Sequence, residues 1–350
     1  MIKFLRIILS PLTIIYKIII NNRNKLFDKN IFKQEFVNAK VISVGNLTVG
    51  GSGKTPLVIN ITKFLKSNSK NVGVLSRGYG RNSKGYQLVS NETEILLDVN
   101  NAGDEIFLVA DECKVPTAVA EKRVFGANNF LSEKDFEIDY LVLDDAFQHR
   151  WIGRDFDILM IEQRFLSNVN SFDQRLLPLG SMREPFDSIS RTDAIVINRK
   201  FSHKITVPAK IKKYFYDKAL FYSYYNISVI YDVKTNKKYS TEEFEGQHSL
   251  VVSGIAKPFS FLRTLKDNGI NIKNKITFTD HKEYTLKEVE NIRKIFYETN
   301  SYSVLTTQKD AVKLMNFNKE LDDIDIYYLK IDLEFEEPEE FYQLLNTKLN

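Results

Sequence analysis

Residues 49–55 read Val49-Gly50-Gly51-Ser52-Gly53-Lys54-Thr55, a glycine-rich segment that indicates the type of fold. It follows a short β-branched run at 41–44 and precedes a segment with helical periodicity at 55–66. Between a strand and a helix, glycines allow backbone N–H groups to surround phosphate oxygens, and the start of the helix adds partial positive charge. In such a loop the lysine reaches the β- and γ-phosphates of a nucleotide, and the threonine hydroxyl binds Mg²⁺.

The loop therefore predicts a site for a nucleoside triphosphate. The alternative is a glycine-rich turn formed by chance, and the strand before it, the helix after it and the lysine–threonine pair all argue against that alternative. One departure is that Thr48 stands where the strict Walker A pattern has a glycine. The residues predicted to bind the nucleotide are Gly50, Gly51, Ser52, Gly53, Lys54 and Thr55.

A second carboxylate for the metal is expected at the end of a hydrophobic strand. The apolar run at 140–143 ends in Asp144 and Asp145, which supply it. One aspartate in this place is commonly a turn or cap residue, but two adjacent carboxylates repel each other and need a cation nearby. We predict that Thr55, Asp144 and Asp145 bind Mg²⁺.

Strand-like and helical segments alternate along most of the chain. Continuous apolar runs at 140–143, 158–161 and 194–197 are typical of strands that are buried on both faces. This alternation predicts an α/β fold of the P-loop NTPase type, with a mainly parallel sheet flanked by helices. A tyrosine-rich segment at 214–231 alternates weakly, and we expect a small antiparallel ribbon there.

The chain of 350 residues suits two domains. We expect a P-loop domain at 26–200 and a smaller C-terminal α/β domain at 201–335. A terminal helix follows at 336–350, for which packing back on the first domain is one option. The single cysteine, Cys113, excludes an intramolecular disulfide and a cysteine-rich zinc site, and it fits a reducing compartment.

The N-terminus combines apolar residues with basic charge. The first 40 residues carry eight basic and two acidic side chains, whereas the remaining 310 have a net charge of −2. Polar residues at 3, 6, 10, 13, 17, 21 and 24 fall on one sector of a helix whose other positions are mostly Ile, Leu, Phe and Tyr. We therefore predict that residues 1–25 form an amphipathic helix at an anionic membrane surface. Pro11 should either kink this helix or mark its first turn. A helix docked on the protein's own core is the alternative.

Two other functions of this N-terminus are not supported. The longest uncharged run, 7–16, is too short for a transmembrane span, and a small-residue cleavage site of a signal peptide is missing. Nucleic acid is not an expected partner, because the basic charge is gathered at one end rather than spread over a domain face.

Seven motifs, in order along residues 43–310, resemble the signature of the tetraacyldisaccharide 4′-kinase family. Ala146 stands where that family more often has glycine, and Gln308 where it often has glutamate. Neither change removes a charged group that the proposed chemistry needs. The motifs are Ser43–Pro56, Ser76–Arg81, Gly103-Asp104-Glu105, Asp144–His149, Leu177–Pro185, Asp280-His281 with Tyr284-Thr285, and Thr306–Asp310.

The resemblance implies a kinase that transfers the γ-phosphoryl group of ATP to the 4′-hydroxyl of a tetraacylated glucosamine disaccharide 1-phosphate. This reaction belongs to lipid A biosynthesis at the cytoplasmic face of the bacterial inner membrane, where a glycolipid and an anionic surface are the partners. A membrane-associated P-loop ATPase or switch protein is the alternative. The nearest match to a guanine-reading motif, at 307–310, has its lysine one position late. The sequence does not indicate the oligomeric state.

The resemblance also suggests roles for individual residues. A sugar hydroxyl needs a carboxylate to accept its proton, and the candidates are Asp104, Asp144 and Asp145. We favour Asp104, tuned by His281, because the two adjacent aspartates occupy the metal position; Lys54 and Asp145 complete the predicted catalytic set. The residues expected at the substrate or phosphates are Arg77, Tyr79, Arg183, Glu184 and His149.

Each of these has a simpler interpretation. His281 could be a histidine of a surface loop, Arg183 and Glu184 could form a solvated ion pair, and His149 could orient the metal site or cap a turn.

Overall fold

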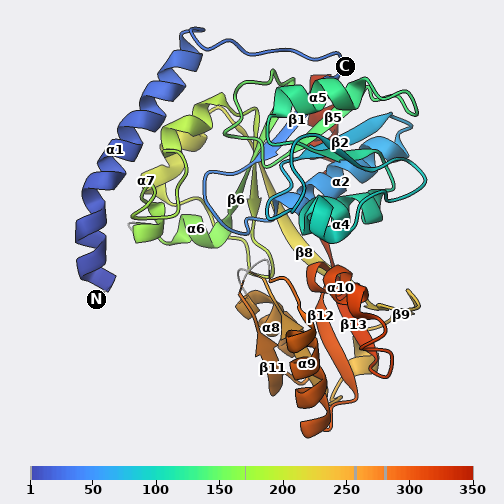
Figure 1. Ribbon diagram of the computed structural model, residues 1–350. Helices are drawn as coiled ribbons and strands as arrows, with labels where there is room; N and C mark the ends of the chain where they lie inside the picture. Colours follow the sequence, from blue (N-terminus) through green and yellow to red (C-terminus); the bar gives the residue numbers. More distant parts are fainter. Residues whose placement is uncertain (1, 170, 256–257, 280–281, 350) are drawn as a thin grey trace.

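The computed structural model describes residues 2–169, 171–255, 258–279 and 282–349. Within these residues a single sheet of thirteen strands runs through two lobes, with the C-terminal lobe below the N-terminal lobe in Figure 1. The strand order is β11-β10-β12-β13-β8-β7-β6-β1-β5-β2-β4-β3, and β9 pairs with β8.

The N-terminal lobe is built on a parallel sheet, with β3 as an antiparallel strand at its edge. Its central strand β1 lies between β5 and β6. The sequence prediction of a mainly parallel α/β sheet is therefore confirmed. The strands are β1 (Lys40–Gly45), β2 (Val72–Ser76), β3 (Gln87–Ser90), β4 (Thr117–Val119), β5 (Tyr140–Asp144), β6 (Phe156–Glu162) and β7 (Ala194–Asn198).

Helices cover both faces of this sheet, because alternate strand residues point to opposite sides. Ile42 and Val44 of β1 join one core cluster with α2, α4 and α11, whereas Val41 joins another with α5. The result is a three-layer arrangement in which both faces of the sheet are buried. The helices are α2 (Lys54–Ser67), α3 (Val99–Ala102), α4 (Asp104–Cys113), α5 (Arg123–Leu131), α6 (Gln163–Ser167) and α7 (Ala209–Lys212), with short 3₁₀ turns between them.

The C-terminal lobe repeats this plan on a smaller scale. Its strands β11, β10, β12 and β13 are parallel to one another. Leu250 and Val252 of β10 pack toward α9 and α10, and Val251 packs toward α8 on the other face. The elements are β9 (Lys238–Tyr239), β10 (Ser249–Ser253), β11 (Asn274–Thr277), β12 (Ser303–Thr307), β13 (Ile326–Phe335), α8 (Pro258–Asp267), α9 (Leu286–Glu298) and α10 (Gln308–Leu314).

Two long strands join the lobes. The 14-residue strand β8 (Ala219–Asp232) pairs in parallel with β7 at its start and antiparallel with β13 over most of its length. The antiparallel ribbon expected at 214–231 is present, because β8 pairs antiparallel with β13 and, over two residue pairs, with the short strand β9. Its pairing with β13 makes it one side of a two-stranded connection between the lobes. A bulge lies between Lys330 and Ile331 of β13, in the middle of this connection.

After β13 the chain returns to the N-terminal lobe. Helix α11 (Pro338–Leu349) buries Phe341, Leu345 and Leu349 in the cluster that also contains α2 and β1. The Phe341 ring lies 4.0 Å from that of Phe335 at the end of β13, so the helix is packed directly behind the connection between the lobes.

Helix α1 (Ile2–Asp28) extends along one side of the N-terminal lobe (Figure 1). It continues through Pro11, so Pro11 does not mark its first turn. Half-buried Ser10, Thr13, Asn21 and Asn24, from the predicted polar stripe, lie toward the protein. We call the opposite side the apolar face; it comprises Leu12, Ile14, Ile15, Ile18 and Ile19, each more than half exposed.

Within the described residues, none of the helices combines the length and the apolar character needed to cross a bilayer.

Candidate active site

The phosphate loop and the paired aspartates meet because their strands are neighbours. Strand β1 is parallel to β5, and Val44 lies opposite Asp144 in the register. The carboxyl ends of parallel strands lie at the same edge of a sheet, which is where such folds bind ligands. The loop after β1 and the carboxylates after β5 therefore share one site, as the sequence predicted.

Two glycines allow this close approach. A Cβ on Gly45 would lie 2.5 Å from the backbone nitrogen of Phe147, so only glycine lets the two loops touch. Gly53 has a φ of +101°. A Cβ on Gly53 would lie 2.3 Å from Asn198 Nδ2 and 2.5 Å from the Tyr225 hydroxyl. The last glycine of the loop is thus held against β7 and β8, directly before helix α2 begins at Lys54.

Several side chains fix the loop in place. Asn198 donates a hydrogen bond of 3.1 Å to the carbonyl of Ser52, and Lys200 donates one of 3.1 Å to the carbonyl of Gly51. The fully buried Asn46 donates to the Ser52 hydroxyl at 3.0 Å. A loop that side chains already hold in place needs little reorganisation when it binds a charged ligand.

Lys54, Asp145 and Arg183 form the charged centre of the site. Asp145 lies 3.4 Å from Lys54 Nζ and accepts two hydrogen bonds from Arg183, of 2.6 and 3.1 Å. Burial raises the pKa of Asp145, but the charges of Lys54 and Arg183 outweigh it and hold the pKa well below its ordinary value. Asp145 has a φ of +49°, a left-handed conformation that costs a non-glycine residue about 1 kcal/mol or more.

Asp144 has the character of a cation ligand. Its side chain is fully buried, and its Oδ1 accepts no hydrogen bond from any described residue. The Ser76 hydroxyl lies 3.3 Å from the other oxygen. Burial, and then the charge of Glu105, raises the pKa of Asp144. A buried carboxylate oxygen without a donor is the arrangement that a bound cation would satisfy.

A cavity of about 880 Å³ opens between the two lobes at this point. The loop residues Gly50–Thr55 line it from above, together with Asp145 and Arg183, and the start of α10 lines it from the C-terminal lobe. Of the other predicted site residues, Arg77 and Tyr79 line the same cavity, and both are exposed.

Asp104 lies at the start of α4 but is not among the residues that line the cavity. It is 5% exposed, and its Oδ2 lies 3.0 Å from Lys313 Nζ of α10. The next residue, Glu105, does line the cavity and accepts a hydrogen bond of 2.8 Å from Lys309. The other member of the predicted pair, His281, lies outside the described residues.

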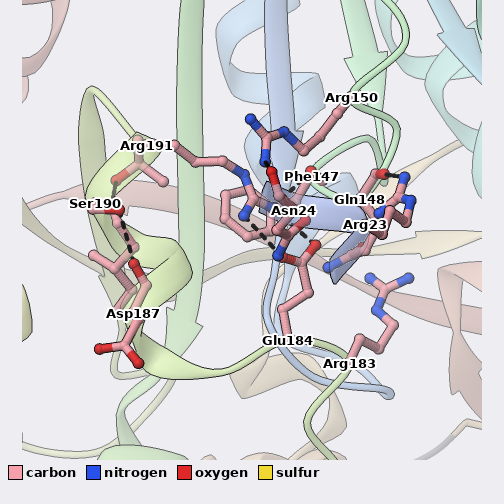
Figure 2. A network of polar contacts seen from close by, with 12 residues as sticks. Arg23, Asn24, Phe147, Gln148, Arg150, Arg183, Glu184, Asp187, Ser190 and Arg191 are labelled. Carbon is pink, nitrogen blue, oxygen red and sulfur yellow. Dashed lines mark hydrogen bonds and ion pairs between the residues drawn. The ribbon is translucent and has the colours of Figure 1, made fainter. Parts of the chain in front are cut away.

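Arg183 and Glu184 face in different directions. Glu184 is fully buried and forms two hydrogen bonds of 2.8 Å with Arg191, whose guanidinium lies 3.8 Å from the centroid of the Phe147 ring. Figure 2 shows Glu184 aimed at Arg191 and at Asn24 of α1, which donates to it at 2.8 Å. The two residues are therefore not a solvated ion pair: Arg183 donates to Asp145 and Asn46, and Glu184 accepts a hydrogen bond from α1.

Further contacts tie α1 to the same loops. The Tyr16 hydroxyl donates to the carbonyl of Arg183 at 2.9 Å, and Arg23 donates to the carbonyl of Gln148. The Gln148 side chain in turn donates to the carbonyl of Asn46 at 2.9 Å. Through these contacts the end of α1 reaches the segment that carries the phosphate loop.

His149 follows Gln148 in the same loop. Burial, and then the charges of Arg123 and Arg77, lowers its pKa to about 3, so the imidazole is neutral at physiological pH. A neutral ring can donate or accept a hydrogen bond near Asp145 but cannot supply positive charge to a phosphate.

Sequence reasoning missed several residues of this site. Asn46, Glu105 and Lys309 lie inside the quoted motifs, so they were visible but had no assigned role. Asn24, Lys200 and Tyr225 carry no local signal, because only the packing of α1, β7 and β8 brings them to the loops.

Among the described residues, no group of three or more His, Cys, Asp or Glu side chains could hold a metal by itself. A P-loop metal site takes its other ligands from a hydroxyl, phosphates and water.

Known proteins resemble this chain over its whole length. A family model described as tetraacyldisaccharide-1-P 4′-kinase matches residues 5–350. The tetraacyldisaccharide 4′-kinases of Chlorobium phaeobacteroides and Halothermothrix orenii are each 34% identical to it, over 98% of this chain and 97% and 93% of theirs. A crystal structure of LpxK from Aquifex aeolicus in complex with ATP matches with a TM-score of 0.79 and 30% identity, covering 99% of this chain and 100% of that chain.

Proposed function

The chain belongs to the tetraacyldisaccharide-1-P 4′-kinase family, and we propose that it performs this family's reaction in the cavity between the lobes. The enzyme is a kinase of lipid A biosynthesis that transfers the γ-phosphoryl group of ATP to the 4′-hydroxyl of a tetraacylated glucosamine disaccharide 1-phosphate. The observation that carries the proposal is the Lys54–Asp145–Arg183 cluster beside an intact phosphate loop, at the wall of the cavity between the lobes.

The nucleotide phosphates bind to the loop. The N–H groups of residues 50–55 surround them, and Lys54 exchanges part of its contact with Asp145 for the β- and γ-phosphates. Arg183 keeps Asp145 in place during this exchange because its two hydrogen bonds to the carboxylate do not involve Lys54. Phosphoryl transfer depends mainly on positioning and charge neutralisation, so this preorganised cluster should dominate the rate.

The residues present fit Mg²⁺. The unsatisfied Oδ1 of Asp144 and the hydroxyl of Thr55, whose residue is 4% exposed and lines the cavity, would hold it, with Asp145 nearby. When bound, Mg²⁺ would neutralise the negative charge that develops on the phosphate oxygens.

The 4′-hydroxyl attacks the γ-phosphorus as the bond to ADP breaks, and its proton needs an acceptor. We assign Asp104 as that acceptor, because Asp145 is engaged by Lys54 and Arg183 and Asp144 by the metal. Asp104 must then exchange its contact with Lys313 for the substrate hydroxyl, which requires a movement of α10 relative to α4.

The apolar face of α1 suits an acylated substrate. Five exposed large side chains, Leu12 to Ile19, lie on one side of a helix whose other side contacts the catalytic loops. An interfacial helix buries such a face at the boundary between headgroups and acyl chains. We propose that this face binds the cytoplasmic surface of the inner membrane and sets the cavity at the level of the disaccharide.

The reaction is tested with the full chain, ATP, Mg²⁺ and a tetraacylated glucosamine disaccharide 1-phosphate dispersed in detergent. We expect mass spectrometry to find one added phosphoryl group on the non-reducing sugar. ATP consumption that releases only free phosphate would instead support the ATPase alternative.

The membrane contact is tested by replacing Ile14, Ile15, Ile18 and Ile19 together with serine. We expect the affinity for vesicles containing phosphatidylglycerol to fall by about tenfold or more, because the buried apolar area is lost. The matched control is Tyr216→Ser with Tyr302→Ser, which removes exposed aromatic surface elsewhere (77% and 74% exposed) and should leave vesicle binding unchanged. Equal vesicle binding by the two variants would refute the assignment of this face.

A further inference from the structure

The motif at 306–310 fixes the start of α10 and thereby the position of Lys309. Thr307 caps α10, and the fully buried Asp310 accepts hydrogen bonds from the backbone N–H of Gly254 at 3.0 Å, from the Tyr284 hydroxyl at 3.0 Å and from the Thr307 hydroxyl at 2.6 Å. These contacts fix the start of α10 to β10 and to the segment before α9. Lys309 lies between the two anchoring residues and lines the cavity.

Lys309 approaches the phosphate side of the cavity. Its Nζ lies 2.8 Å from Glu105 of α4. The charge of Lys309, and to a smaller extent that of Lys54, lowers the pKa of Glu105. Glu105 is therefore within electrostatic reach of two ammonium groups, one from each lobe.

The lining of the cavity brings Lys309 and the phosphate loop together. Lys309 lines the same cavity as Gly50–Thr55, Asp145 and Tyr225, although it comes from the other lobe. The Tyr225 hydroxyl lies against the loop, 2.5 Å from the place that a Cβ on Gly53 would occupy. In agreement with this placement, burial raises the pKa of Tyr225 and the charge of Lys309 lowers it by a smaller amount.

We propose that Lys309 is a further catalytic residue, an ammonium group from the C-terminal lobe that binds the terminal phosphate of ATP opposite Lys54. Glu105 is its positioning residue and keeps the ammonium aimed across the cavity. The inference rests on the proposed function. A lysine has three donors, so Lys309 can contact Glu105 and a phosphate oxygen together, and such charge-assisted hydrogen bonds are among the stronger ones in proteins.

The competing explanation is that Lys309 only holds the lobes together. Other pairs between α4 and the C-terminal lobe do the same, since Glu112 accepts hydrogen bonds from Gln308 at 2.6 Å and from Lys330 at 2.8 Å. Glu112→Gln weakens these interlobe contacts and leaves the Lys309 ammonium in place, so it is the matched control.

The experiment measures the dissociation constants of Mg·ATP and Mg·ADP by calorimetry, without glycolipid, for the full chain and for Lys309→Ala, Lys309→Arg and Glu112→Gln. We expect Lys309→Ala to weaken Mg·ATP binding about tenfold while Mg·ADP binding changes less than about twofold, because only ATP has the terminal phosphate. Lys309→Arg should restore most of the loss, and Glu112→Gln should leave the ratio of the two constants as in the unmodified protein.

Equal weakening of ATP and ADP binding by Lys309→Ala, or no weakening of either, would overturn the assignment of Lys309. An unmodified protein that binds neither nucleotide would instead refute the proposed function itself, so the two failures can be told apart.

Discussion

The two walls of the cavity are built in different ways. The upper wall consists of the phosphate loop with Lys54, Asp145 and Arg183, and these charged groups are paired within the N-terminal lobe. The lower wall presents Lys309 of α10, and Lys313 lies four residues further along this helix, outside the cavity lining. Both lysines are paired with carboxylates of the opposite lobe, on α4.

This difference separates charged groups that are held within one lobe from charged groups whose positions depend on how the two lobes are arranged. Contacts within one lobe persist if the lobes move, because they belong to one packed core. Contacts between α4 and α10 change with any movement about the connection formed by β8 and β13. The charged groups of the upper wall are therefore fixed within one lobe. The position of Lys309 on the lower wall depends on both lobes.

The largest effect is expected on the upper wall. Lys54→Ala should lower kcat/KM for phosphoryl transfer by about 10³-fold, because the loop loses the cation that neutralises the transferred group. The fold should persist, since Asp145 retains both hydrogen bonds from Arg183. Steady-state kinetics and thermal unfolding measure the two effects. The control is Lys66→Ala on the same helix, which should retain activity; a Lys54→Ala loss below tenfold would contradict a preorganised upper wall.

A smaller effect distinguishes the two possible roles of Asp104, which is buried where α4 contacts α10. If Asp104 accepts the proton, Asp104→Asn should lower kcat about 10²-fold. Lys313→Met removes its partner but keeps the carboxylate, so it should cost less than about tenfold. Both variants are compared by kcat at saturating ATP. Equal losses in the two variants would mean that Asp104 contributes only its ion pair with Lys313.

The smallest effect concerns the stability of the lower wall. Burial raises the pKa of Glu112, but hydrogen bonds from Lys330 and Lys63 outweigh it and lower the pKa from 4.5 to about 2. Since the folded-state pKa is below the unfolded one, the carboxylate stabilises the fold above about pH 4.5 and loses this contribution as the pH falls toward 2.

Glu112→Gln should therefore lower the free energy of unfolding at pH 7 by about 1–3 kcal/mol, allowing for solvent screening. Urea unfolding at several pH values measures this, and the difference between the two proteins should shrink as the pH falls toward about 2.5. A difference that stays constant with pH would show that the ionised carboxylate is not its cause.

Much of the upper wall could be predicted from the sequence. The loop, the paired aspartates and the parallel sheet were visible because each depends on a local pattern: glycines before Lys54, two acids after an apolar run, and alternation of strands with helices. The family assigned from seven motifs is confirmed by the match over residues 5–350.

Other features were hidden because they depend on packing between distant segments. The sequence showed that one sector of α1 is polar but not that this sector faces the protein. Arg183 and Glu184 are neighbours in the sequence, but the fold directs them differently. Arg183 contacts Asp145, and Glu184 contacts Asn24, which is 160 residues away in the chain. An antiparallel ribbon was predicted at 214–231, but only pairing with β13, about 100 residues later, made this segment the connection between the lobes.

The glycine-rich loop, the class of fold and the family follow from the sequence, because short-range geometry specifies such a loop between a strand and a helix. The charges that face one another across the cavity, and the contacts of α1 with residues 148, 183 and 184 through its polar side, follow only from the folded chain. A side chain's partner depends on the packing of elements far apart in the sequence, and no spacing within a motif encodes that packing.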